Sequence, residues 1–260
     1  MKFIVAMIAL WCGITAAAEA ATPAISIVLS NQEYPPYMGQ SLPGYGLMSR
    51  VVTEAFRLQN VQVRYAFFPN NRTLQSARSG QVDGSIGWAI TPERQRDLLY
   101  TDAVMSLRMV FFQRRDQVVK WKTLSDLAPY RIGITTGNTY SDEFTRLQQS
   151  GVLHTEAVPD DVVNLRKLAV RHIDLFPIDA EVGQMLVYHS LAPTEQAQLQ
   201  AGSTAFWIAP MHVVIWRGQP QAEELVRRFN LGLQQLRASG EFDRLVEMTR
   251  KQIRLVVGRD

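Results

Sequence analysis

Strand-like and helix-like segments alternate from residue 24 onward. Apolar runs of strand length, such as AISIVLS (24–30) and VDGSIGW (82–88), are separated by segments whose apolar residues have helical spacing. This alternation is typical of a parallel sheet covered by helices, with right-handed crossovers. The expected elements are strand 24–30, helix 46–59, strand 61–68, helix 70–80 ending at Gly80, and strand 82–88.

The same pattern returns in the second half of the chain. The expected elements there are a short helix 123–127, strand 130–136, helix 140–151, strand 154–159, helix 160–172 capped by Asp160, strand 173–178 and helix 179–190. Two terminal helices follow, and Leu225, Phe229, Leu233 and Leu236 fall on one face of the first, as core residues do. We therefore predict an α/β protein with two similar lobes.

Two extended segments connect these halves, SLRMVFFQRRDQVVKW (106–121) and STAFWIAPMHVVIWRG (203–218). Two crossings form a hinge, so we expect residues 21–113 plus 206–260 in lobe 1 and residues 114–205 in lobe 2. Ligands of open α/β sheets bind beyond the carboxyl ends of the strands. Arg94 follows the third strand and is therefore expected at the cleft between the lobes.

The first twenty residues resemble a secretory signal peptide. Lys2 is followed by an apolar segment and by a small-residue cleavage site before Ala21. We expect cleavage after residue 20, export to the periplasm and a soluble mature protein. The single cysteine, Cys12, lies inside the signal, and Trp11 before it argues against a lipoprotein. The mature chain would then use no disulfide.

Charge and motifs exclude several function classes. Acidic and basic residues are interleaved around a net charge of +3, so we expect no nucleic-acid partner. The sequence has no glycine-rich nucleotide loop and no Gly-x-Ser-x-Gly turn. The four histidines are His154, His172, His189 and His212. They lack metal-ligand spacing, and we expect neither a metal nor another cofactor.

One stretch resembles a known family. DGSIGWAITPERQRDLLYTD is similar to the signature of periplasmic solute-binding proteins of the polar amino-acid type, family 3, and NQEYPPY and SGEFDRLVEMTRK add to the likeness. The resemblance implies the type II periplasmic-binding fold and no catalysis. It implies an amino acid or small carboxylate as ligand, and an ABC permease that reads the closed form. We expect a monomer.

The resemblance also assigns three binding residues. Arg94 would clamp the ligand carboxylate with its rigid fork of donors, unless it pairs with Glu93 or Asp97 on the surface. Thr139 would donate to the same carboxylate, or cap the following helix. Asp179 would receive the ligand's α-ammonium, with a helix N-cap as the alternative.

Five further positions match pocket-lining positions of the family. Tyr34 would form an aromatic wall beside Asn31 and Asn70, with ordinary packing as the alternative. Trp88 and Ala89 stand where amino-acid binders often carry hydroxyl residues, and Trp88 could stack on a flat or cationic group. Asn31 replaces the acid of some cationic-ligand binders.

Two other classes of function stay open. Some proteins of this fold are periplasmic dehydratases of the cyclohexadienyl type, and Asp179 or Glu181 could then act as the acid. A sensory module that reports to a membrane receptor would have the same sequence features as a transport protein.

Overall fold

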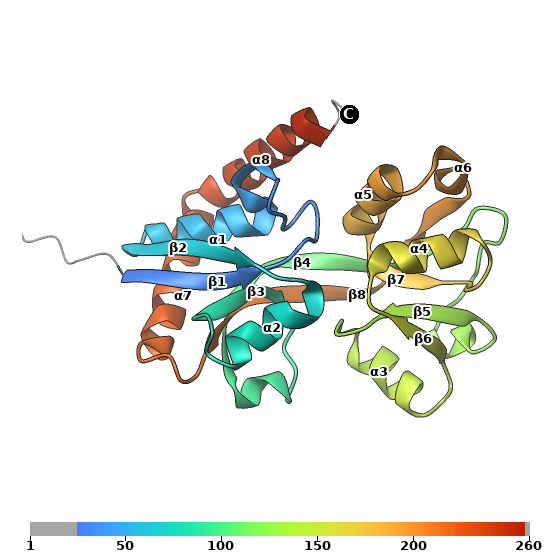
Figure 1. The fold of residues 1–260 in the computed structure, drawn as a ribbon, viewed down its shortest axis with the longest axis horizontal. Coiled ribbons are helices and arrows are strands. Elements are labelled where there is room, and N and C mark those ends of the chain that lie inside the picture. Colours follow the sequence, from blue (N-terminus) through green and yellow to red (C-terminus); the bar gives the residue numbers. More distant parts are fainter. Residues whose placement is uncertain (1–24, 258–260) are drawn as a thin grey trace, which may run out of the picture.

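The computed structural model describes residues 25–257, so the predicted signal peptide lies outside the described residues. Two α/β lobes lie side by side, and the long strands β4 and β8 run through both (Figure 1). The prediction of two lobes joined by two extended crossings is confirmed. Among the described residues, no helix combines the length and apolar character needed to cross a membrane.

Lobe 1 is built from the predicted strand-helix alternation and the two C-terminal helices. Strand β1 pairs in parallel with β2 and β3, and β3 pairs antiparallel with β8. Helices α1, α7 and α8 pack together over the sheet, and α2 packs against β1 and β3 (Figure 1). The elements are β1 Ile25–Asn31, α1 Leu47–Arg57, β2 Val61–Phe67, α2 Asn70–Arg78, β3 Gly84–Trp88, α7 Ala222–Ala238 and α8 Glu241–Val257.

Lobe 2 has a smaller sheet. Strands β5 and β6 pair in parallel, Ile132 bridges Leu175, and β7 pairs antiparallel with β4. Ser141, Asp160 and Asp179 cap α3, α4 and α5 by accepting hydrogen bonds from first-turn amides. The elements are β5 Arg131–Thr135, α3 Asp142–Gln149, β6 His154–Val158, α4 Asp161–Ala169, β7 Phe176–Asp179, α5 Ala180–Ser190 and α6 Pro193–Gln196.

The crossing strands begin and end earlier in the chain than the predicted extended segments. Strand β4 spans Leu98–Arg114 and β8 spans Leu199–Trp216, and they pair antiparallel along most of their length. Residues 109–112 already pair with β7 of lobe 2. The division of the lobes at residue 113 stays a prediction, and this pairing favours a crossing a few residues earlier.

The core residues predicted on α7 are confirmed. Leu225, Phe229, Leu233 and Leu236 are all at most 1% exposed, and the Phe229 ring packs 5.0 Å from that of Phe56 on α1. Burial of these side chains holds the C-terminal helices on lobe 1.

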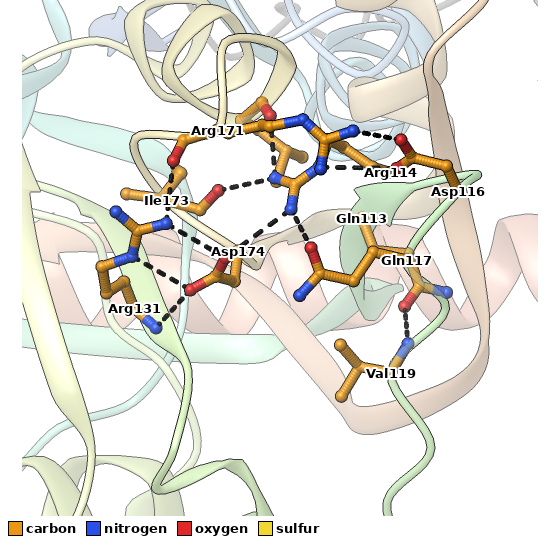
Figure 2. Close-up of polar contacts among 10 residues, drawn as sticks. Gln113, Arg114, Asp116, Gln117, Val119, Arg131, Arg171, Ile173 and Asp174 are labelled. Atoms are coloured by element: carbon orange, nitrogen blue, oxygen red, sulfur yellow. Dashed lines mark hydrogen bonds and ion pairs between the residues drawn. The ribbon is translucent and has the colours of Figure 1, made fainter.

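A buried arginine fastens the end of β4 inside lobe 2. The Arg114 guanidinium donates to the carbonyl oxygens of Leu168 and Ile173, at 3.2 and 3.0 Å, and lies 3.7 Å from the Asp174 carboxylate. Asp174 also pairs with Arg131 of β5 at 3.1 Å (Figure 2). The network joins β4, β5 and the segment before β7, and so attaches the end of the crossing strand to lobe 2.

Candidate functional site

A pocket lies between the lobes where β3 ends. Lobe 2 contributes Asn138 and Thr139 to its lining, and the other lining residues come from lobe 1 and the crossing strands. Its volume is about 50 Å³, and the Arg94 guanidinium bridges the two lobes beside it by donating to the Gly137 carbonyl. Much of the wall is apolar, with side chains from Met38, Met48, Trp88, Leu107, Met109 and Met211.

Arg94 lines this pocket. It lies on a 3₁₀ helix, Arg94–Arg96, and is only 7% exposed. One guanidinium nitrogen donates to the Ala89 carbonyl at 3.2 Å, and the other reaches across to the Gly137 carbonyl of lobe 2 at 3.3 Å. Burial lowers the pKa of Arg94 from its usual value. The anticipated surface pairing with Glu93 or Asp97 is taken by Arg78 instead.

Trp88 and Ala89 position this arginine. The Trp88 ring lies 5.1 Å from the Arg94 guanidinium carbon, in cation–π contact, and its indole nitrogen donates to the Ser85 hydroxyl at 2.7 Å. The bulge that turns β3 before Trp88 falls at Gly87, whose φ of 85° favours glycine. Both Trp88 and Ala89 line the pocket, and the Ala89 carbonyl accepts from Arg94.

Thr139 faces Arg94's pocket from lobe 2. It is partly buried in the turn between β5 and α3. The N-cap of α3 is Ser141, whose hydroxyl accepts from the Phe144 amide at 3.2 Å. Thr139 therefore does not serve as the helix cap.

Asp179 is buried and fully engaged. Its carboxylate accepts from the backbone amides of Arg108, Glu181 and Val182, at 2.8, 2.9 and 3.1 Å, and is 1% exposed. Burial raises the pKa of Asp179 above its usual value. The Tyr37 hydroxyl contacts the same carboxylate, and burial together with that contact raises the pKa of Tyr37. A carboxylate offers about four acceptor positions, so little capacity remains for a ligand.

Asn31 and Asn70 are two further predicted lining residues. Asn31 is fully buried, its amide nitrogen donates to the Ser49 hydroxyl at 3.0 Å, and its oxygen accepts from the Gln32 amide at 2.9 Å. It lines neither of the interlobe cavities, so we leave it out of the site. Asn70 begins α2, and its side chain lies outside the described part of the structure.

Tyr34 joins the pocket to a second, larger cavity. This cavity of about 560 Å³ also lies between the lobes and shares Gln32 and Tyr34 with the pocket. Burial and the neighbouring Asp161 carboxylate raise the pKa of Tyr34. Thr135 and Asp161 line the cavity from lobe 2.

Asp161 and Gln32 were missed in the sequence. Asp161 accepts a hydrogen bond from the Thr135 hydroxyl, and burial raises its pKa from 3.8 to about 6. Gln32 is 7% exposed. The one sequence signal for Gln32 was its place in the NQEYPPY motif. Asp161 had no such signal, because it resembles an ordinary first-turn residue of a helix.

We expect Asp161→Asn to raise the free energy of unfolding at pH 7 by on the order of 2 kcal/mol. The folded carboxyl binds its proton more tightly than the unfolded one, so the wild type loses stability as pH rises from about 4 to 6. Asparagine is neutral throughout and can still accept from Thr135. Urea unfolding of both proteins at pH 4 and pH 7 measures this; an equal difference at the two pH values contradicts it.

Among residues 25–257, no group of three or more His, Cys, Asp or Glu side chains is placed to hold a metal ion. The site consists of the buried Arg94 guanidinium, an apolar wall rich in methionine, a few polar side chains and the Asp161 carboxyl in the second cavity.

Solved structures share this architecture. A histidine kinase sensor domain similar to periplasmic binding proteins matches with a TM-score of 0.68 and 19% identity, over 85% of this chain and 93% of that one. An arginine transport-system periplasmic binding protein from Legionella pneumophila matches with a TM-score of 0.69 and 16% identity, over 86% and 99%.

An amino acid ABC transporter substrate-binding protein from Streptococcus pneumoniae, bound to L-arginine, matches with a TM-score of 0.68 and 18% identity, over 87% and 95%. At these identities the likeness shows the fold. No curated protein sequence matches the chain. The family model for bacterial extracellular solute-binding proteins, family 3, matches residues 27–248, and the chain belongs to this family.

Proposed function

We propose that this protein is a periplasmic binding protein that holds a small carboxylate-bearing solute, of the amino-acid class, between its two lobes. The observation that carries the proposal is Arg94, a buried guanidinium in the interlobe pocket. It contacts two backbone carbonyls, the Tyr100 hydroxyl and the Trp88 ring, and forms no ion pair among the described residues. A buried cation without an anionic partner is unfavourable, and a ligand carboxylate would supply that partner with matched geometry.

The ligand would stabilise closure because it touches both lobes. Arg94 would hold the carboxylate from lobe 1, and Thr139 would donate to it from lobe 2. A ligand shifts a conformational equilibrium only by its difference in affinity for the two states. Contacts from both lobes exist only in the closed state, so binding favours closure.

Other contacts already link the lobes in the closed arrangement. Arg250 on α8 pairs with Glu181 on α5 at 2.5 Å, and Tyr37 of lobe 1 contacts Asp179 of lobe 2. Figure 1 shows α8 extending over lobe 1 towards the side on which α5 lies. Ligand binding would add to these contacts, and an ABC permease would recognise the result. The ABC transporter proteins among the solved neighbours support this partner.

A sensory role is the second candidate. The same fold serves as a histidine kinase sensor domain in one solved neighbour. Closure around a solute would then be read by a receptor instead of a permease. The named neighbours are binding or sensor proteins, and this supports binding without turnover.

A ligand screen tests the proposal. The protein lacking residues 1–20 would be heated with single amino acids and small carboxylates, and its unfolding temperature measured. A ligand at about 100 times its Kd adds roughly 2.7 kcal/mol to stability, which is readily detected. The proposal fails if no carboxylate raises the unfolding temperature, or if every stabilising compound lacks a carboxylate.

A further inference from the structure

Two charges face the interlobe space from opposite lobes without an ionic partner. Within residues 25–257, neither Arg94 nor Asp161 forms an ion pair: Arg94 donates to carbonyl oxygens and Asp161 accepts from the Thr135 hydroxyl. Arg94 lines the small pocket and Asp161 the larger cavity. The buried Arg94 and the partly buried Asp161 each gain most from a ligand group of the opposite sign.

Gln32 lies between these two charges. It lines both the pocket and the cavity, and only 7% of it is exposed. Its amide oxygen is buried and has no hydrogen-bond partner among the described residues. A buried acceptor left unpaired is unfavourable by about 1–3 kcal/mol, and a ligand donor would satisfy it.

The volumes indicate how a ligand would be divided. The space beside Arg94 measures about 50 Å³, less than a tenth of the adjoining cavity. The adjoining cavity of about 560 Å³ lies within the range of ordinary ligand sites. The body of the ligand would therefore extend past Gln32 and Tyr34 towards Asp161.

The position of the ligand's amine follows from the fact that the Asp179 carboxylate is already occupied. Three backbone amides and the Tyr37 hydroxyl occupy its carboxylate, and Asp179 does not line the small pocket. An α-ammonium held next to the Arg94-bound carboxylate would thus have no free acid beside it. The free acid is Asp161, and Glu33 and Asp160 add negative charge to the same cavity.

We infer that the site selects ω-amino carboxylates, whose carboxylate pairs with Arg94 and whose terminal amine binds at Gln32 and Asp161. The inference rests on the proposed function, because it uses the same arginine. It moves the acid of the site from Asp179 to Asp161.

Carboxylates that differ in the number and position of their amines test the inference. Isothermal titration would compare pentanoate, 2-aminopentanoate and 2,5-diaminopentanoate with 4-aminobutanoate, 5-aminopentanoate and 6-aminohexanoate. We expect one of the three ω-amino acids to bind at least about tenfold more tightly than pentanoate, 2-aminopentanoate or 2,5-diaminopentanoate. Its carboxylate would pair with Arg94 and its amine with Asp161, and it would bring no α-ammonium that lacks a partner. Equal or tighter binding of either α-amino compound overturns the inference.

Asp161→Asn should weaken binding of the preferred ω-amino acid by about tenfold or more and change pentanoate binding by less than about threefold. Asp142→Asn is the matched control, since Asp142 also opens a lobe 2 helix but is exposed and lines neither cavity. An equal loss in both variants overturns the assignment of Asp161. The comparison of ligands on the wild-type protein stands even if a variant fails to fold.

The two proposals fail in different ways. If simple carboxylates or α-amino acids bind through Arg94 and the ω-amino acids show no preference, the inference is wrong and the proposed function stands. If none of the six compounds binds while another carboxylate stabilises the protein, the inference is again wrong and the proposed function again stands. If no carboxylate binds at all, both are wrong.

Discussion

Arg94→Ala is expected to weaken binding of a carboxylate ligand by two to three orders of magnitude or more. Removing one partner of a buried charged pair typically costs about 3–5 kcal/mol, and each 1.4 kcal/mol is tenfold in Kd. The protein should still fold, because Arg94 contacts only uncharged groups, two carbonyls, the Tyr100 hydroxyl and the Trp88 ring, so its removal leaves no buried acid unpaired. Titration of a ligand found in the thermal screen measures the loss.

Two further variants separate charge from geometry. Arg96→Ala is the control: it removes an arginine from the same 3₁₀ helix, but one that is exposed and outside the pocket, so binding should change little. Arg94→Lys keeps the charge and loses the planar fork, and we expect an intermediate affinity. Equal binding by Arg94→Ala and Arg96→Ala would end the clamp assignment.

Gly232→Ala is expected to lower the free energy of unfolding by about 3 kcal/mol. A methyl group at this position of α7 would lie 1.9 Å from the Ala55 carbonyl oxygen on α1 and 2.7 Å from its carbon. Both atoms belong to the backbone, so the two helices would have to separate. That movement would loosen the packing of Phe56 against Phe229.

The sign of this effect is informative. Alanine is a better helix former than glycine by about 1 kcal/mol, so propensity alone predicts a gain in stability. For a protein of this size, a 3 kcal/mol loss lowers the unfolding temperature by about 6–12 °C. Gln234→Ala, at an exposed position of the same helix, should change stability by less than about 0.5 kcal/mol. A more stable Gly232→Ala variant would show that α1 and α7 do not pack this closely.

The order of strands and helices could be predicted from the sequence because hydrophobic periodicity and helix caps are local properties. Asp160 and Gly80 mark helix ends in the sequence and do so in the structure. The extent of the crossing strands could not be predicted. Strands β4 and β8 begin earlier than expected because they pair with partners far away in the chain, from both lobes.

The amino-acid sequence by itself determined the two-lobed α/β architecture, the core face of α7 and the place of Arg94 at the end of β3. Only the tertiary structure decided which polar side chains face the ligand space. The Asn31 side chain donates to the Ser49 hydroxyl and lies outside both cavities, while its neighbour Gln32 lines both. Asp179 is occupied by an amide from Arg108, 71 residues away, while Asp161 has no ion pair among the described residues. The physical reason is that a side chain's free bonding capacity depends on packing partners brought together by folding, which local sequence does not encode.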